Sequence, residues 1–464
     1  MTEDAYRPPI TPFGGWQPDK RTGHLRPLET APHILGLAPP GTGKTRRWLS
    51  QSAVLWPGPA VVSSSKDDLM QMVAQRRWGR AALLDLRPIT APHYPNEFER
   101  CRYDPTTLIA TLDDAQATAE TLLSMSSVAF GGLQSRPSAD NGMWENLAFA
   151  PLVCLLFAAS PAALGQGMEW VLEAAEDATT PQKWPQIGAQ MSTDPSWVTA
   201  AMWCGNPLFE ARVRGILNMV EKQRDSVKMT VTKSLTAWLR TSIRDRNLKT
   251  FDPAFLDDPG TTLYILSTAQ GSVAPQPVTL MEQLIQRQRV KVAQWEEYPR
   301  IGLFLDELPN TPLPNIQQWF AESRGLGVSI CAAAQATSQL DVIYGPLQGK
   351  AIREVVPATL IMYGAHEEEL MRSAAFWGGK TTRSHQSYDH NRDDSSTSRQ
   401  FGNVFEPEEL SPRDIGEARL LVRGKPGERV ELIEWTDFVK YLDELRDARR
   451  RRRGGGGGGG GAKR

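Results

Sequence analysis

Short apolar runs alternate with helical patterns over most of the chain, which is typical of an α/β domain with a parallel sheet. The first run, His33–Leu37, ends in a turn rich in Gly and Pro, and helix-like spacing follows over Thr45–Val54. We predict strands at His33–Leu37, Ala60–Ser64, Ala81–Leu86, Thr261–Leu266, Ile301–Leu305, Val328–Ala333, Thr359–Tyr363 and Ala418–Val422.

Residues 106–249 follow a different pattern. Their apolar positions recur at helical spacing, as at Val227, Val231, Leu235 and Trp238, and we find no convincing strand among them. We therefore predict an all-helical domain at 106–249 that is inserted into an α/β domain made of residues 31–105 and 250–440.

One segment of the helical region is apolar enough to be compared with a membrane span. Residues Asn146–Met168 carry no charge, and a span needs about 20 apolar residues. Pro151 and Pro161 interrupt the segment, and it separates two halves of one predicted site. We interpret it as a buried helix.

Both ends of the chain and one internal segment are polar. Residues 1–30 are rich in Pro, Gly and charge and show no secretory signal, so we predict a flexible segment. Residues 441–464 contain Arg449–Arg453 followed by eight glycines, which predicts a disordered tail. The serine-rich stretch Thr381–Phe401 is predicted to be a loop.

Composition and charge exclude several classes of protein. The 464 residues are 40% apolar and 23% charged, which is ordinary for a folded domain and excludes a fibre. Lys and Arg (52) nearly balance Asp and Glu (53), so the chain is not a strongly basic nucleic-acid coat. The 4 cysteines form no CxxC pair, which argues against a zinc cluster or a disulfide framework and suits a reducing cytoplasm.

A phosphate-binding loop follows the first predicted strand. Residues 38–45 read Ala-Pro-Pro-Gly-Thr-Gly-Lys-Thr, a Walker A motif with Ala at the first Gly position. Glycines allow backbone N–H groups to turn toward phosphate oxygens, and the following helix adds its positive end. Lys44 is expected to contact the β- and γ-phosphates, and Thr45 to bind Mg²⁺. The predicted ATP contacts are Pro40, Gly41, Thr42, Gly43, Lys44 and Thr45.

The acidic half of the site is predicted at the end of the strand Ile301–Leu305. Asp306 would hold Mg²⁺ through water, and Glu307 would polarise the attacking water, which favours hydrolysis over nucleotide binding alone. Gln335 ends the next strand and is a candidate to contact the γ-phosphate or that water. The long separation between Lys44 and Asp306 is explained by the inserted domain.

In this order, the motifs resemble the coupling ATPases of conjugative type IV secretion systems, the TraG/TraD-like group. Besides the Walker A loop, the resemblance rests on Val61–Leu69, on Thr261–Leu266 and most specifically on Leu305–Tyr344, and it covers roughly residues 30–435. It implies a RecA-like P-loop domain with an all-α insertion, six copies around a DNA channel, and ATP-driven pumping of DNA–protein substrates.

The resemblance also assigns Arg324 as an arginine finger that acts on the ATP of a neighbouring subunit. Two departures stand out: Ser64 replaces the usual Asp near the end of the second strand, and only about 30 residues precede the first strand. The family's N-terminal membrane helices are therefore not seen. We expect a chain without a transmembrane segment of its own, located in the cytoplasm and recruited to the inner face of the membrane by an anchored partner.

Basic residues supply candidate DNA contacts. Residues 210–250 contain ten basic and four acidic residues, so they are either a phosphate-binding surface or an ordinary solvated helix face. The candidates are Arg224, Lys228, Arg287 and Arg289, and the arginine tail is a further one.

The leading hypothesis is a DNA-translocating ATPase that transfers a relaxase–DNA complex or another secretion substrate. One alternative is a nucleotide-controlled docking platform for secreted proteins. Another is an FtsK/HerA-like or phage-packaging motor. No further cluster of carboxylates favours a nuclease.

Overall fold

The computed structural model describes residues 11–88, 97–128, 139–184, 191–268, 273–294, 298–389 and 394–454. In this part of the chain a 13-stranded sheet forms the centre of the molecule, in the order β2-β1-β15-β14-β11-β3-β10-β9-β4-β8-β5-β6-β7. Its strands are β1 (Trp16–Pro18), β2 (Leu25–Pro27), β3 (Ile34–Leu37), β4 (Ala60–Ser64), β5 (Ala81–Asp85), β6 (Glu99–Arg102), β7 (Lys249–Thr250), β8 (Thr262–Leu266), β9 (Ile301–Leu305), β10 (Val328–Ala334), β11 (Ala358–Met362), β14 (Glu417–Val422) and β15 (Glu428–Glu431).

The sheet is mostly parallel. All pairs from β11 through β3, β10, β9, β4, β8, β5 and β6 to β7 are parallel, whereas β14, β15, β1 and β2 extend one edge with antiparallel pairs. Each of the eight strands predicted from the sequence is present. They could be predicted because strands that are buried on both faces of a parallel sheet appear in the sequence as short apolar runs. The predicted α/β class with a mostly parallel sheet is confirmed.

Two hydrophobic clusters cover the two faces of the sheet. One contains Leu35 and Leu37 and continues into the long helices, and the other contains Ile34, Trp48 and Phe304. The second cluster requires a glycine in β3. A Cβ atom on Gly36 would lie 2.1 Å from Cζ3 of Trp48, so the indole ring can pack against the strand only where no side chain is present.

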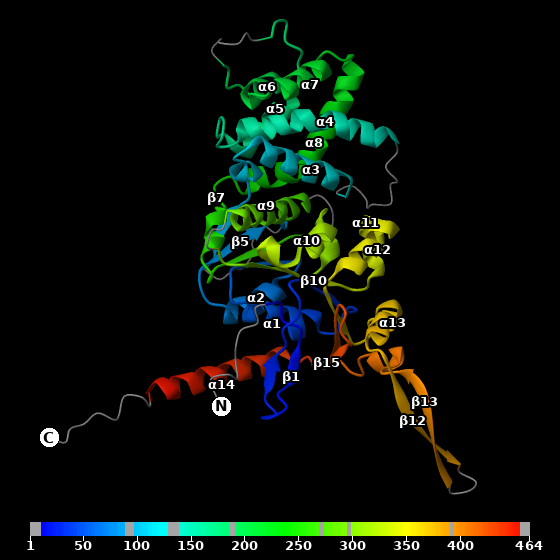
Figure 1. Cartoon of the computed structure of the whole chain (residues 1–464). Coiled ribbons are helices and arrows are strands. Elements are labelled where there is room, and N and C mark those ends of the chain that lie inside the picture. The colour runs from blue at the N-terminus through cyan, green and yellow to red at the C-terminus, as the bar shows by residue number, and fades with distance from the viewer. Residues whose placement is uncertain are drawn as a thin grey trace, which may run out of the picture.

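The helices are distributed unevenly along the chain (Figure 1). Those that follow the strands of the sheet are α1 (Ser50–Leu55), α2 (Asp67–Arg76), α9 (Pro275–Ala293), α10 (Ile316–Glu322), α11 (Ser338–Tyr344), α12 (Pro346–Val355), α13 (Glu368–Trp377) and α14 (Trp435–Gly454). Those at one end of the molecule are α3 (Leu112–Val128), α4 (Ala139–Ala159), α5 (Gly167–Glu176), α6 (Trp197–Cys204), α7 (Pro207–Leu217) and α8 (Glu221–Arg244). This grouping supports the inserted domain at 106–249, whose limits we keep as a proposal.

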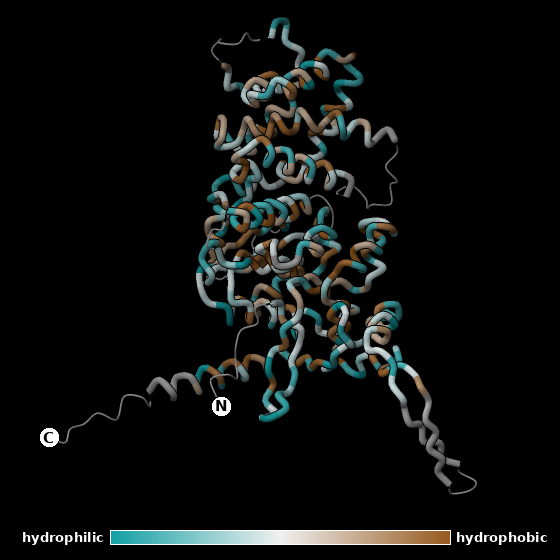
Figure 2. Tube along the Cα trace, in the orientation of Figure 1, coloured by the Kyte–Doolittle hydropathy of each residue, from teal (hydrophilic) through white to brown (hydrophobic). Residues whose placement is uncertain are grey.

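Helix α4 contains the apolar segment that invited comparison with a membrane span. Among the described residues, Gly142–Ala159 has the length and composition of a span, with a mean hydropathy of 1.5, and 56% of it is buried inside the protein. Leu152, Val153 and Leu155 are fully buried, and α4 packs against α3, α5, α6, α7 and α8. Figure 2 shows its apolar course in the middle of the helical end. The helix thus forms the core of that end.

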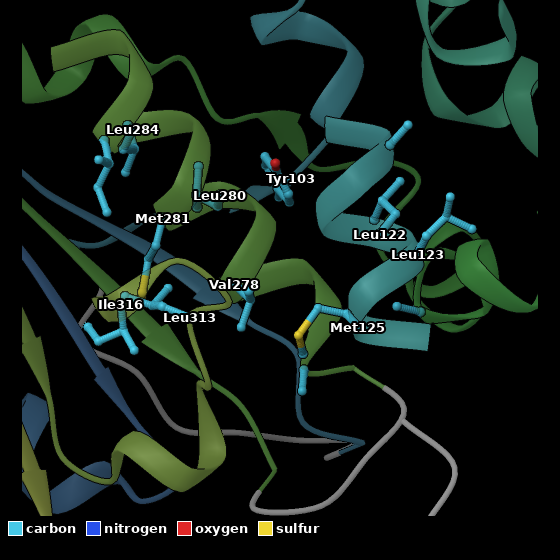
Figure 3. Close-up of a cluster of buried hydrophobic side chains, with 14 of the residues drawn as sticks. Tyr103, Leu122, Leu123, Met125, Val278, Leu280, Met281, Leu284, Leu313 and Ile316 are labelled. Atoms are coloured by element: carbon cyan, nitrogen blue, oxygen red, sulfur yellow. The ribbon is translucent and has the colours of Figure 1, made fainter. Parts of the chain in front are cut away.

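Helices α3 and α9 join the helical end to the sheet. Figure 3 shows Leu122 and Leu123 on α3 and Leu280 and Leu284 on the neighbouring helix α9, and all four side chains are buried. Below α9, Leu313 and Ile316 complete the same cluster. The helical end is therefore attached through a continuous apolar core.

Three predictions for polar segments were wrong in part. Within residues 1–30, β1 and β2 belong to the sheet, and Phe13 and Trp16 are fully buried. The predicted loop at Thr381–Phe401 is instead largely a hairpin of β12 (Lys380–Asp389) and β13 (Asp394–Asn403), which pair in an antiparallel register. The predicted disordered tail begins as helix, since α14 continues to Gly454; residues 455–464 lie outside the described residues.

Candidate nucleotide-binding site

The Walker A residues form a loop between β3 and its following helix. Gly41 has a φ of 80° and Gly43 a φ of 83°, a left-handed conformation that favours glycine and turns successive N–H groups to one side. A turn of π-helix, η2 (Lys44–Leu49), follows and runs into α1. A Cβ on Gly41 would meet nothing within 4 Å, so the loop leaves open space beside its backbone.

The two halves of the site meet at the carboxyl edge of the sheet. Because β10 lies between β3 and β9, the residues that follow these strands come together. The Lys44 ammonium lies 2.7 Å from Oε2 of Glu307, and the Thr45 hydroxyl donates to Oδ1 of Asp306 at 2.9 Å. These four predicted residues thus form one cluster, although more than 250 positions separate the pair Lys44 and Thr45 from the pair Asp306 and Glu307.

Ser64 also belongs to this cluster, although the sequence indicated only that it replaces the family's usual Asp near the end of the second strand. Strand β4 pairs with β9 in the register Ser63↔Leu305, which places the next residue of β4 beside Asp306. The Ser64 hydroxyl donates to Oδ2 of Asp306 at 3.0 Å. Both oxygens of Asp306 are therefore oriented by hydroxyl groups, from Thr45 on one side and Ser64 on the other.

The residues present fit a nucleotide with Mg²⁺. Glu307 has one oxygen, Oε1, that is buried without a hydrogen-bond partner among the described residues, which is where a water molecule would be bound. Thr45 and Asp306 present adjacent oxygen atoms, the ligand type that Mg²⁺ prefers. The described ranges contain no group of three or more His, Cys, Asp or Glu residues that could hold a metal ion.

Gln335 and Arg324 are placed differently. Gln335 directly follows β10, at the same edge as Asp306, and its backbone N–H donates to Oε1 of Gln339 at 2.9 Å. Thr337 of the same loop donates to Glu367 through both its N–H and its hydroxyl, at 2.8 and 2.7 Å. Arg324 lies in the 3₁₀ turn η6 (Ser323–Leu326), and its side chain is outside the described residues.

The P-loop helix is held from outside by the segment that precedes α14. Arg46 and Arg47 form ion pairs with the two carboxylate oxygens of Glu434, at 2.6 and 3.1 Å. Arg47 also donates to the carbonyl of Leu432 at 2.8 Å, and Gln51 donates to that of Ile433 at 2.8 Å. The residues directly after Lys44 and Thr45 are thus fixed to the last part of the chain.

The four candidate DNA contacts already have partners in the chain. Lys228 of α8 pairs with Glu176 at 2.8 Å, and Arg287 of α9 binds both oxygens of Asp257. Arg224 donates to the Thr180 hydroxyl at 2.8 Å, and Arg289 pairs with Glu322 at 3.2 Å. A phosphate group would have to displace these partners.

Comparisons with known proteins found one matching family model and several similar folds. Residues 300–414 match the family model described as "TraM recognition site of TraD and TraG". Among solved structures, the unbound monoclinic form of the bacterial conjugative coupling protein TrwBdeltaN70 aligns with a TM-score of 0.56 and 18% identity, over 89% of this chain and 87% of that one. A search of the curated proteins found no match.

Nucleotide complexes of the same plasmid coupling protein, TrwB, are similar to this chain as well. The complex with the ATP analogue ADPNP has a TM-score of 0.53 and 17% identity, over 87% of this chain and 86% of that one. The complex with ADP and Mg²⁺ has a TM-score of 0.54 and 17% identity, over 89% and 88%. The predicted RecA-like fold is confirmed, and so is the resemblance to TraG/TraD-like coupling ATPases.

Proposed function

We propose that this chain, which resembles TraG/TraD-like coupling ATPases, hydrolyses ATP to move DNA toward a secretion channel. The observation that carries the proposal is the cluster of Lys44, Thr45, Asp306 and Glu307 at one edge of the sheet. It combines phosphate-binding, metal-binding and water-activating groups, which a protein that only binds nucleotide does not need together. The TrwB complexes with ADPNP and with ADP and Mg²⁺ support ATP and Mg²⁺ as its ligands.

The ion pair in the site suggests how binding prepares hydrolysis. In the structure the Lys44 ammonium forms an ion pair with Glu307. A γ-phosphate would attract Lys44 more strongly than a single carboxylate does, because it carries more negative charge. Glu307 would then be free to accept a proton from the attacking water, while Thr45 and Asp306 hold Mg²⁺, which neutralises phosphate charge. Gln335 would report the state of the γ-phosphate to the loop that Glu367 holds.

The assembly is part of the same proposal. Six copies would surround a DNA channel, with Arg324 of one copy acting on ATP bound to its neighbour. The chain would work in the cytoplasm, at the inner face of the membrane, next to an anchored partner protein. Of the basic candidates, Arg224, Lys228, Arg287 and Arg289 would contact DNA only after exchanging their internal partners.

A second function is favoured by a separate observation. The matched model for residues 300–414 is described by a recognition site for TraM, so this region is a candidate for binding a partner protein. Under this alternative, the chain is a nucleotide-controlled docking platform. Nucleotide hydrolysis would then release a docked protein, and DNA would have no effect on its rate.

The proposed function is tested by measuring ATP hydrolysis with and without DNA. We expect single-stranded or double-stranded DNA, or both, to raise the hydrolysis rate of the full chain several-fold. We also expect added DNA to change its oligomeric state. If a hexameric preparation hydrolysed ATP at a rate that neither form of DNA changed, the result would contradict the DNA-translocating motor. It would favour the docking platform. Tight binding of a secretion substrate in the absence of DNA would further favour the docking platform over the motor.

Substituting Ser64 should change how much Mg²⁺ the reaction needs. Without the Ser64 hydroxyl, one oxygen of Asp306 loses its hydrogen bond, so Asp306 is oriented less well toward the metal. A hydrogen bond to a charged group stabilises by about 1.5 kcal/mol, so we expect Ser64→Ala to raise the Mg²⁺ concentration for half-maximal hydrolysis about tenfold. Titrating the ATPase rate with Mg²⁺ measures this.

The matched control for this substitution is Ser63→Ala, at the preceding buried position of β4. The rate at saturating Mg²⁺ should change little in either variant. Equal Mg²⁺ requirements for the wild type and both variants would show that Ser64 does not position Asp306.

A further inference from the structure

Two further loops flank the P-loop at the carboxyl edge of the sheet. Strand β3 lies between β10 and β11 and is parallel to both, with Leu37 opposite Ala334 on one side and Ile361 on the other. The P-loop after β3 therefore has the loop that begins at Gln335 on one side and the turn after β11 on the other. Ligands of parallel sheets bind at this edge, so both loops are in a position to respond to a bound nucleotide.

The turn after β11 lies close beside the P-loop. Gly364 belongs to this turn and has a φ of 80°. A Cβ atom added to Gly364 would lie 3.5 Å from Cγ of Pro39 and 3.9 Å from Cγ2 of Thr42. Pro39 and Thr42 are themselves joined, because the Thr42 hydroxyl donates to the carbonyl of Pro39 at 2.8 Å. The turn is thus placed against the first half of the phosphate-binding loop.

Glu367 connects this turn to the loop after β10. Its Oε1 accepts from the backbone N–H of Thr337 at 2.8 Å, and its Oε2 accepts from the Thr337 hydroxyl at 2.7 Å. Thr337 is the second residue after Gln335, whose own N–H donates to Oε1 of Gln339 at 2.9 Å. The short segment from Gln335 to Thr337 is therefore held at both ends.

Glu367 holds Thr337 as a buried carboxylate. The residue is 7% exposed, and among the ion pairs of the described ranges none includes it. Arg353, which lies 3.4 Å from the Thr337 carbonyl, pairs instead with Asp341 at 2.7 Å. Hydrogen bonds to an ionised acceptor are roughly twice as strong as those to a neutral one. Glu367 thus fixes the loop more firmly than a neutral side chain would.

We propose that Glu367 is a positioning residue that, by holding Thr337, keeps Gln335 where it contacts the γ-phosphate, so that the site distinguishes ATP from ADP. The inference rests on the proposed function, in which Gln335 is the residue that responds to the γ-phosphate. It deepens that function by naming the acid on which this response depends. Glu367 acts only through the loop and does not touch the nucleotide.

Discrimination is tested without hydrolysis, by titrating the full chain with fluorescent derivatives of ADP and of the ATP analogue ADPNP in the presence of Mg²⁺. Glu367→Ala removes both hydrogen bonds of the pair, and Thr337→Val removes only the one from the hydroxyl. We expect both variants to bind the ATP analogue at least fivefold more weakly, with an ADP affinity within twofold of the wild type. Thr337→Ser keeps the hydroxyl and should restore the wild-type affinities.

The matched control is Glu369→Ala, at an exposed acid in the first turn of α13. It should bind both nucleotides as the wild type does. An equal loss of ADP and ATP-analogue binding in Glu367→Ala and Thr337→Val would show a general structural role and overturn the proposal. Unchanged affinity for the ATP analogue in both variants would overturn it as well.

Action through Gln335 is tested by a double-mutant cycle of single-turnover hydrolysis rates. We expect Gln335→Ala and Glu367→Ala each to lower the rate at least tenfold. The double variant should be within twofold of Gln335→Ala, because residues that act as one unit have non-additive effects. A double variant in which the two losses multiply would overturn the route through Gln335.

Failure of this inference and failure of the proposed function give different results. If Glu367→Ala hydrolysed ATP at the wild-type rate while Lys44→Ala did not hydrolyse it, the proposed function would stand and Glu367 would have no positioning role. If the wild type bound both nucleotides but hydrolysed no ATP, with or without DNA, the proposed function would be wrong. A selective loss of ATP-analogue binding in Glu367→Ala and Thr337→Val would then still support the role of Glu367.

Discussion

Replacing Lys44 with alanine should abolish ATP hydrolysis and weaken nucleotide binding. Lys44 is the cation of the cluster, and its removal would leave the Glu307 carboxylate, which repels phosphate, beside the expected position of the γ-phosphate. Removal of a charged group that stabilises the transition state costs about a hundredfold to a thousandfold in rate. The measurement is the DNA-dependent ATPase rate together with nucleotide affinity.

The matched control for Lys44→Ala is Lys350→Ala on the surface of α12, where the side chain is 64% exposed. It should hydrolyse ATP at the wild-type rate. Mixing Lys44→Ala chains with Arg324→Ala chains tests the assembly in the same assay. Partial recovery of activity supports an arginine that acts across subunits, whereas full activity of Arg324→Ala alone would contradict that role. Hydrolysis by Lys44→Ala near the wild-type rate would refute the proposed site.

Replacing Glu307 with glutamine should separate binding from hydrolysis. Glutamine cannot accept a proton from water, and loss of a general base costs about a hundredfold to ten-thousandfold in rate. The neutral amide also no longer forms an ion pair with Lys44, so the ammonium is free for phosphate. We therefore expect almost no hydrolysis but equal or tighter ATP binding, measured by single-turnover rates and equilibrium titration.

A control of the same chemistry is Glu368→Gln on α13, where the acid is 69% exposed and pairs with Arg372. That variant should retain wild-type turnover. If Glu307→Gln hydrolysed ATP at a comparable rate, another group would have to activate the water. If it lost ATP binding as well, the pair with Lys44 would be structural, and the mechanism in which nucleotide releases Glu307 would be wrong.

The sheet and the two Walker motifs were predictable because their signals are local. Each buried parallel strand is an apolar run, and the motifs follow directly after two of these runs, at Leu37 and Leu305. Strands β1 and β2 gave no such signal. They are three residues long and partly polar, and they join the sheet only through a pair between Trp16 and Glu431, at the other end of the chain.

The parts of the candidate site that escaped prediction depend on register and on partners. Nothing in the residues around Ser64 indicates Asp306 as its neighbour; the pairing of β4 with β9 brings the two together. For the same reason, the sequence did not show that the DNA candidates have partners within the chain. Lys228 and Arg287 are basic in sequence, but Glu176 and Asp257 lie beside them in space.

The pairing of the chain's two end segments has a consequence for how the protein is made. Strand β1 needs β15, and the P-loop helix needs Glu434, so neither is supported until almost the whole chain has left the ribosome. Contacts of such long sequence separation form late. Helices α3 to α8 end at Arg244, so they are synthesised 190 residues before Glu434. The proposed nucleotide site would therefore be completed only after Glu434 has been synthesised.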